Sequence, residues 1–144
     1  TTGGSFIFPV AAMSNVAQGA AALSVLLILR KDNKMKGIAS ASGISALLGI
    51  TEPAIFGVNL KLRYPFFGAM IGSAVGSAYV MLTKVLAISP GAAGLPGIIS
   101  IRPTSIVNYI IAMILSMVVA VVSTIVIAKF MNKKQVVNDE QIAA

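Results

Sequence analysis

The chain has 144 residues, of which 57% are hydrophobic and 10% are charged, and its formal net charge is +7. A soluble domain carries roughly 25% charged residues, so this composition predicts an integral membrane protein. The basic residues form short runs at the ends of apolar stretches, which is typical of membrane topology signals and argues against a nucleic-acid partner. The sequence has no cysteine and no histidine, which excludes thiolate and imidazole chemistry, and we expect no cofactor.

Residues 6–29 form the first predicted transmembrane helix, because about twenty apolar residues are needed to cross a bilayer. Just before it, the chain starts without an initiator Met or a signal peptide, so we expect it to be the last part of a longer transporter. Asn15 and Gln18 lie in this apolar stretch. They either form hydrogen bonds to neighbouring helices or line a polar cavity.

Residues 37–60 do not have the pattern of a simple lipid-facing helix. Glu52 is the only acidic residue between Asp32 and Asp139, and Pro53 follows it. Proline disfavours helical geometry at the residue before it and suits the first turn of a new helix, so Glu52 is predicted to lie at a break between two short helices. A carboxylate at membrane depth usually faces a cavity or a partner, which makes this break the first place to look for a substrate.

Residues 64–87 form the second predicted span. Gly68, Gly72 and Gly76 are spaced four apart on one face of it, which predicts close helix packing rather than a functional site.

Three further segments complete the chain. Residues 89–103 are rich in glycine and proline and form either a surface loop or a segment that folds back toward the cavity. Residues 106–128 are the third predicted span, and residues 135–144 form a polar tail that we place in the cytoplasm.

The basic runs at residues 30–36, 61–63 and 129–134 predict the topology. All three lie on the cytoplasmic side if residues 37–60 form a re-entrant hairpin, whereas Lys84 and Arg102 then lie on the other side. The expected fold is therefore an all-α integral membrane protein with about three transmembrane helices and one re-entrant helical hairpin, forming part of a larger transporter domain.

Three motifs carry a family resemblance. Residues 49–60 read GITEPAIFGVNL, residues 13–19 read MSNVAQG, and residues 95–101 read LPGIISI. Together they resemble the C-terminal half of the membrane IIC component of the bacterial sugar phosphotransferase system. Within the glucose superfamily of that system, the chain is most similar to the sucrose, trehalose and β-glucoside branch, with the sucrose type closest. Residues 1–134 would then be the C-terminal part of the IIC transport domain.

The resemblance implies a role for Glu52, since in this family the glutamate of the motif lies in a re-entrant hairpin and binds sugar hydroxyls. We therefore take Glu52, Thr51, Asn15 and Gln18 as candidate sugar-binding residues. A carboxylate can accept two hydroxyl hydrogen bonds, and charge-assisted bonds are roughly twice as strong as neutral ones.

The alternative for Glu52 is a purely structural role. Its side chain could cap the helix that begins at Pro53, or form an ion pair with Lys61 or Arg63.

The resemblance also implies partners. A disaccharide would be the substrate, membrane lipid would surround the spans, and the missing N-terminal half of IIC would supply a histidine. The IIB and IIA domains would carry the phosphoryl group, with a phosphocysteine on IIB, and the complete system would be a protein-phosphocysteine sugar phosphotransferase. A homodimer in the bacterial inner membrane is expected, and this chain alone should neither phosphorylate nor transport sugar.

Other functions remain open at this stage. A trehalose or β-glucoside permease of the same system is the first alternative. An ion-coupled secondary transporter is the second, because broken helices and intramembrane carboxylates also bind cations or protons. A structural membrane module is the third, and it leaves Glu52 unexplained.

Overall fold

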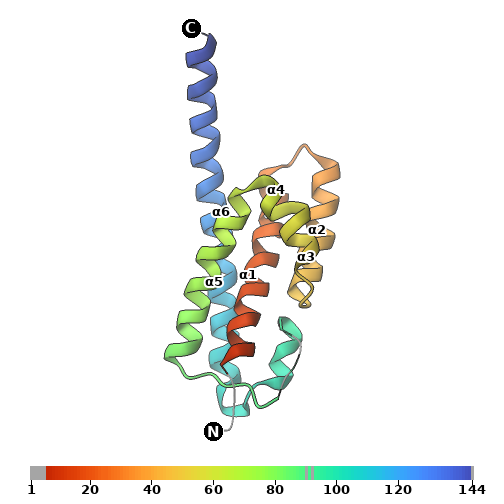
Figure 1. The fold of residues 1–144 in the computed structure, drawn as a ribbon, viewed down its shortest axis with the longest axis vertical. Helices are drawn as coiled ribbons and strands as arrows, with labels where there is room; N and C mark the ends of the chain where they lie inside the picture. Colours follow the sequence, from red (N-terminus) through yellow and green to blue (C-terminus); the bar gives the residue numbers. More distant parts are fainter. Residues whose placement is uncertain (1–5, 90, 92, 144) are drawn as a thin grey trace.

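The computed structural model describes residues 6–89, 91 and 93–143, and every regular element in this part of the chain is helical (Figure 1). The long helices are α1 (Ile7–Ile28), α2 (Asn33–Leu47), α5 (Tyr64–Leu82) and α6 (Ile106–Ala143). The short ones are α3 (Glu52–Ala54), the π-helical turn η1 (Ile55–Asn59), α4 (Leu60–Leu62), and the 3₁₀ turns η2 (Leu95–Ser100) and η3 (Pro103–Ser105). The expected all-α fold is thus confirmed.

Three helical segments are long and apolar enough to cross a membrane: Ile7–Ile28, Tyr64–Leu82 and Pro103–Lys134. They lie side by side, and α5 runs in the opposite direction to α1 and α6 (Figure 1). The expected number of about three membrane-length apolar helices is therefore confirmed.

Buried side chains form one cluster where α1 meets α5 and α6, and another where α1 meets α2 and the segment from α3 to α5. The first cluster includes Met13, Val16, Val80, Tyr109 and Met113, and the second includes Val25, Met35, Ala39 and Val58. Because α1 contributes to both clusters, it is the central helix of the fold.

The glycine stripe of α5 packs against α6, as predicted. A Cβ atom added to Gly72 would lie 2.6 Å from the Cβ of Ala120, and one added to Gly76 would lie 2.6 Å from the Cβ of Ser116. An added Cβ on Gly68 would also overlap α6. The backbones of α5 and α6 therefore approach each other more closely than a residue larger than glycine would permit at these three positions.

A single hydroxyl joins α1, α5 and α6 at this contact. The Oγ of Ser116 on α6 lies 3.0 Å from the main-chain oxygen of Gly72 on α5 and 3.2 Å from that of Met13 on α1. Ser116 is fully buried, so its hydroxyl bonds to backbone rather than to solvent. Such interhelical hydrogen bonds are each worth about 0.6 kcal/mol in membrane bundles.

The second span ends earlier than expected, at Leu82 rather than at residue 87. The hydroxyl of Thr83 donates a hydrogen bond back to the main-chain oxygen of Tyr79 at 2.8 Å, and Lys84 adopts a left-handed conformation with φ of 53°. A non-glycine residue in this conformation cannot continue a right-handed helix. The chain then runs to an antiparallel bridge between Ala87 and Ile101.

The third span continues beyond residue 128. Helix α6 runs without a break through the lysines at positions 129, 133 and 134 to Ala143, and it extends past the other helices (Figure 1). Charged side chains end the apolar stretch but do not end a helix, because lysine is a good helix former. The polar tail is therefore a continuation of α6.

The segment from α2 to α4 is a helical hairpin. Asp32 is the N-cap of α2, and its carboxylate accepts a hydrogen bond from the main-chain N–H of Met35 at 3.0 Å. The chain reverses after Leu47, and α3, η1 and α4 return to the end of the bundle from which α2 started (Figure 1).

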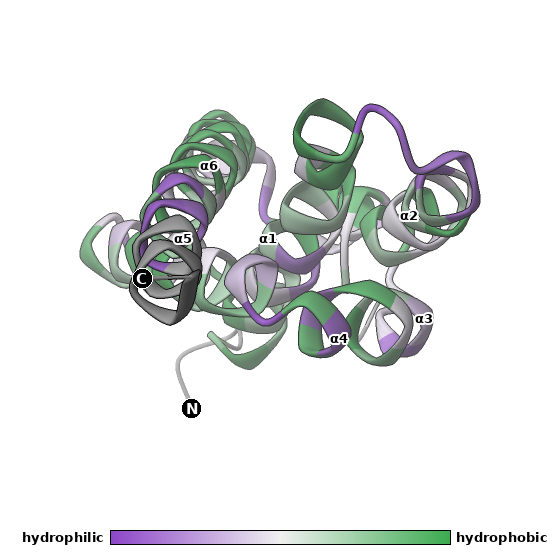
Figure 2. Ribbon diagram, turned by 90° about the horizontal axis from the view of Figure 1, so that it is seen from above, coloured by the Kyte–Doolittle hydropathy of each residue, from purple (hydrophilic) through white to green (hydrophobic). Residues whose placement is uncertain are grey.

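The three basic runs lie at this same end, which we call the basic end. Leu29, just before the first run, and Leu62, within the second, pack on the same cluster as Met35, and Lys129 shares a pocket with Arg30. Figure 2, viewed onto this end, shows hydrophilic segments between α1 and α2, at α4 and on α6.

Candidate functional site

Glu52 lies at the tip of the hairpin, where the chain turns between α2 and α3. α2 ends at Leu47, and the main-chain N–H of Ile50 donates a hydrogen bond back to the oxygen of Ser45 at 3.0 Å. Thr51 is the N-cap of α3, Glu52 is the first residue of that helix, and Pro53 lies in its first turn. The predicted helix break is therefore confirmed, and proline occupies a position where its missing N–H is not needed.

The carboxylate of Glu52 is exposed and has no hydrogen-bond or ion-pair partner among the described residues. Capping of α3 by a side chain is not observed at Thr51. Lys61 lies near the other end of the returning segment, which has a rise of roughly 15 Å over its eleven residues. Neither structural alternative for Glu52 is therefore realised in this conformation.

Gln18 is tied to the returning segment by Asn59. The Nδ2 of Asn59 donates to the side-chain Oε1 of Gln18 at 2.5 Å and to its main-chain oxygen at 3.1 Å. Asn59 is fully buried, and Gln18 is 8% exposed. This pair is an interhelical contact of the kind expected as one of the two alternatives for Gln18.

Asn59 was not among the residues singled out from the sequence. It closes the π-helical turn η1, in which the N–H of Leu60 bonds to the oxygen of Ile55, five residues earlier. Such turns are frequent at functional sites. The feature of the sequence that could have identified Asn59 is its amide side chain, which lies within the motif at residues 49–60, seven residues after Glu52. The Oδ1 of Asn59 is buried and has no hydrogen-bond partner within the part of the chain that the structure describes.

Asn15 fixes the segment between α5 and α6. Its Nδ2 donates to the main-chain oxygen of Ala93 at 2.8 Å, and the hydroxyl of Tyr109 donates to the oxygen of Gly94 at 3.1 Å. Both side chains therefore hold the same stretch of backbone.

This stretch packs against the hairpin tip. A Cβ added to Gly49 would lie 2.5 Å from the oxygen of Ala93, and one added to Gly94 would lie 2.5 Å from the oxygen of Leu47. Gly49 and Gly94 also have φ values of 106° and 148°, which favour glycine. Within residues 89–103, Ala93 and Gly94 therefore fold back onto the hairpin tip, whereas Ile99 is 90% exposed.

Glu52 and Thr51 lie at the hairpin tip, Gln18 contacts the returning segment, and Asn15 contacts the backbone that packs on the tip. The four side chains differ in how many of their polar groups already form hydrogen bonds. Glu52 and Thr51 make no side-chain hydrogen bond among the described residues, whereas Asn15 and Gln18 each use one side-chain group in a protein contact. The Oδ1 of Asn15 and the Nε2 of Gln18 have no hydrogen-bond partner in the described part of the chain. The arrangement can present an acceptor carboxylate, a hydroxyl and two amides to a polyhydroxylated ligand. The described residues contain no group of three side chains suited to a metal ion.

Comparison with known proteins agrees with these motifs. The family described as "Phosphotransferase system, EIIC" matches residues 2–73. The chain is 62% identical to the sucrose-specific EIIBC component of Staphylococcus xylosus and 58% identical to that of Pasteurella multocida, over 80% and 89% of its length respectively. It is 47% identical to the trehalose-specific EIIBC component of Bacillus subtilis over 91% of its length.

The chain spans only about a quarter of each of these relatives: 24%, 27% and 28% in the same order. No solved structure matches it. Half of the chain, including the hairpin and Glu52, falls within the family match, and the chain belongs to the EIIC family of the phosphotransferase system.

Proposed function

We propose that this chain is the C-terminal part of a IIC permease domain that moves a sugar across the bacterial inner membrane while the sugar is phosphorylated. The observation that carries the proposal is the Glu52 carboxylate, which has no partner among the described residues and lies at a helix break within the residues that match the family. A carboxylate in an apolar chain needs an interaction that compensates for its desolvation, and sugar hydroxyls supply it.

The sugar site combines Glu52 with the groups around the hairpin tip. Glu52 accepts hydrogen bonds from two hydroxyls, and the Thr51 hydroxyl supplies a further contact. Asn15 and Gln18 contribute the amide groups that their protein contacts leave free. The N-terminal half of IIC, with its histidine, closes the site from the other side.

The hairpin of α2, α3, η1 and α4 re-enters the membrane from the cytoplasmic side in this proposal. α2 is about 22 Å long and the returning segment roughly 15 Å, so neither is long enough to cross about 30 Å of hydrocarbon. All three basic runs lie at the basic end, in agreement with the tendency of lysine and arginine to remain in the cytoplasm. Leu48 and Ile50 are 54% and 59% exposed in this chain, so in the complete permease other protein segments or a water-filled cavity surround the irregular backbone at residues 48–51.

Phosphorylation depends on partners outside this chain. With no histidine and no cysteine, the chain cannot carry the phosphoryl group on either of these residues. We propose that IIB and IIA domains deliver it, IIB through a phosphocysteine, and that two copies of the permease form a homodimer. Relatives named EIIBC and EIIBCA components support this assignment over an ion-coupled use of Glu52.

Sucrose is the proposed substrate. Four sucrose-specific relatives are 50–62% identical to the chain, whereas two trehalose-specific relatives are 47% and 40% identical. Two other sucrose-specific relatives, at 43% and 44%, overlap with the trehalose range, so direct competition is the deciding experiment.

The complete permease, purified in detergent, should bind radiolabelled sucrose, and unlabelled sucrose should displace it at a lower concentration than trehalose. Preferential displacement by trehalose would replace the substrate but keep the transport function. Failure of both sugars and of a β-glucoside to bind would overturn the proposed function.

A further inference from the structure

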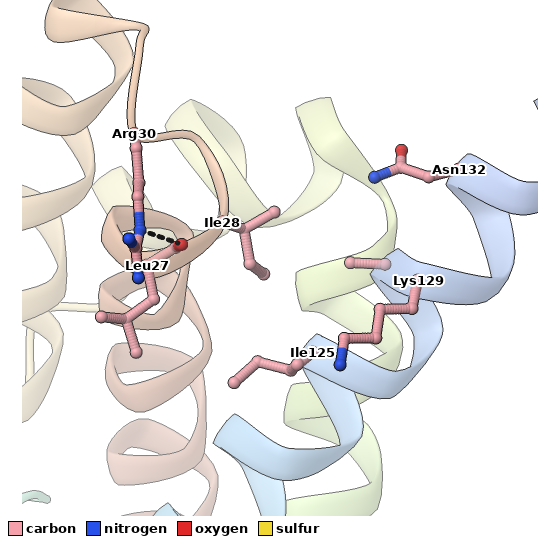
Figure 3. Close-up of a pocket in the computed structure, with 7 residues that line it drawn as sticks. Leu27, Ile28, Arg30, Ile125, Lys129 and Asn132 are labelled. Atoms are coloured by element: carbon pink, nitrogen blue, oxygen red, sulfur yellow. Dashed lines mark hydrogen bonds between the residues drawn. The ribbon is translucent and has the colours of Figure 1, made fainter.

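A pocket of about 360 Å³ opens at the basic end, between the last turn of α1 and α6 (Figure 3). α1 and the residues after it contribute Leu27, Ile28 and Arg30, and α6 contributes Ile125, Lys129 and Asn132. The pocket is separate from the hairpin tip, and nothing in the proposed sugar site uses it.

The lining changes from apolar to polar in the direction that leads out of the membrane. Ile125, Lys129 and Asn132 have a spacing of four and then three residues, so they lie on one face of α6. The rise from Ile125 to Asn132 is about 10 Å. Figure 3 shows Ile125 and Asn132 reaching from α6 toward the end of α1, where Ile28 faces them and Arg30 lies beyond. Ile125 and Ile28 thus lie on the membrane side of the pocket and Asn132 at its mouth, while Lys129 extends its amine toward Ile125 (Figure 3).

No ion pair among the described residues neutralises the cations of this pocket. The Nε of Arg30 donates to the main-chain oxygen of Leu27 at 3.3 Å, but the rest of its guanidinium group has no partner among the described residues. Lys129 is exposed and also has no partner in that part of the chain. The nearest acid in sequence, Asp32, caps α2 through the N–H of Met35.

We propose that this pocket binds one anionic phospholipid of the cytoplasmic leaflet. Its phosphate lies between Arg30 and Lys129 and accepts a hydrogen bond from Asn132, and its acyl chains cover Leu27 and Ile125. Leu27 is 58% exposed in the chain, so the lipid buries apolar surface as well as pairing charge. Basic pockets between transmembrane helices on the cytoplasmic side are suited to anionic headgroups. A free phosphate ion would leave the apolar side unused, which is why lipid is the occupant we choose.

The lipid proposal depends on the proposed membrane orientation of the chain. It does not depend on which sugar the permease transports. Native mass spectrometry of the complete permease tests it, with phosphatidylglycerol and phosphatidylcholine offered in equal amounts. We expect one tightly retained phosphatidylglycerol per subunit, and the Arg30→Gln/Lys129→Gln variant to retain it about tenfold less.

The Lys34→Gln/Lys134→Gln variant is the matched control. Like the pocket variant, it removes two positive charges from the basic end, but from exposed positions outside the pocket. It should therefore retain the lipid as the parent does. The melting temperature, measured in parallel, should be unchanged in both variants and shows that they are folded.

A photo-crosslinking residue at position 125 gives a second measurement in an otherwise unchanged protein. It should capture phosphatidylglycerol. Three results would overturn the proposal: equal retention of the two lipids, equal loss in the two double variants, or capture of another protein segment at position 125. Full displacement of the lipid by glycerol phosphate would also overturn it, because the pocket would then bind phosphate without acyl chains.

Discussion

The side chain of Asn59 donates a hydrogen bond of 2.5 Å to the side chain of Gln18, across 41 residues of sequence. The same Nδ2 lies 3.1 Å from the main-chain oxygen of Gln18, so one amide holds the returning arm of the hairpin to the central helix twice. Asn59 follows Glu52 by seven residues on the same short helical segment. The position of Glu52 relative to α1 therefore depends on this buried pair.

Replacing one partner of the pair should be worse than replacing both. Asn59→Leu leaves the Gln18 oxygen buried without a donor, which costs about 1–3 kcal/mol, whereas replacing both partners by apolar groups can be nearly neutral. We expect the Asn59→Leu/Gln18→Leu variant of the complete permease to melt closer to the parent than Asn59→Leu alone. Melting temperatures that fall additively would show that the two side chains are not coupled.

Glu52→Gln should weaken sugar binding while the fold is retained. Glutamine keeps the volume of glutamate but removes the charge that strengthens hydroxyl hydrogen bonds, so we expect affinity to fall by at least about tenfold, or about 1.4 kcal/mol. Equilibrium binding of sucrose to the purified permease measures this effect.

Asp32→Asn is the control for lost negative charge. Asparagine is a good N-cap residue, so the start of α2 should be preserved, and sucrose affinity should not change. Equal affinity of the Glu52→Gln variant and the parent would remove Glu52 from the site.

The topology predicts the sidedness of three lysines. Lys34 and Lys61 belong to the basic end, whereas Lys84 follows α5 at the opposite end. Single cysteines at positions 34 and 61, in a permease whose other cysteines are replaced, should react with an impermeant maleimide only in inverted vesicles. A cysteine at position 84 should react in right-side-out vesicles. Labelling of positions 34 and 61 from opposite sides would mean that the hairpin crosses the membrane.

Gly72→Leu should separate α5 from α6. A Cβ at this position already approaches the Ala120 Cβ to 2.6 Å, and a larger side chain cannot be accommodated without moving the backbone. We expect a lower folded yield and a loss of about 1–3 kcal/mol in stability. Ala78→Leu, at an exposed position on the same helix, should behave as the parent in size-exclusion and thermal-melting assays. Similar yields for both variants would contradict the packing assigned to the stripe.

Features that depend on a few neighbouring residues could be predicted from the sequence. Pro53 restricts the backbone before it, so the helix break beside Glu52 follows from local geometry. The spacing of Gly68, Gly72 and Gly76 places them on one helix face, and a small-residue face is useful only for close packing.

Features that depend on distant contacts could not be predicted. The approach of Gly94 to Gly49 and the Asn59–Gln18 pair each join residues more than 40 positions apart, and no local pattern specifies them. The end of α5 at Leu82 was missed for another reason. Hydropathy continues through residues 85–88, but the left-handed Lys84 has already ended the helix.

The last prediction concerns the division of the sugar site between this chain and the rest of the permease. In the proposed site, the chain contributes Glu52, Thr51 and the amides of Asn15 and Gln18, and the proposed histidine lies outside the chain. A ligand held by half of its partners leaves polar groups imperfectly paired and still loses its translational freedom, so more than half of the binding free energy is lost. We expect the isolated 144-residue chain to bind neither sucrose nor trehalose in a detergent binding assay, and co-expression with the N-terminal half of IIC to restore sucrose binding. Restoration should fail when the co-expressed chain carries the Glu52→Gln change, which separates loss of the site from loss of assembly. Sucrose binding by the isolated chain would refute the shared site.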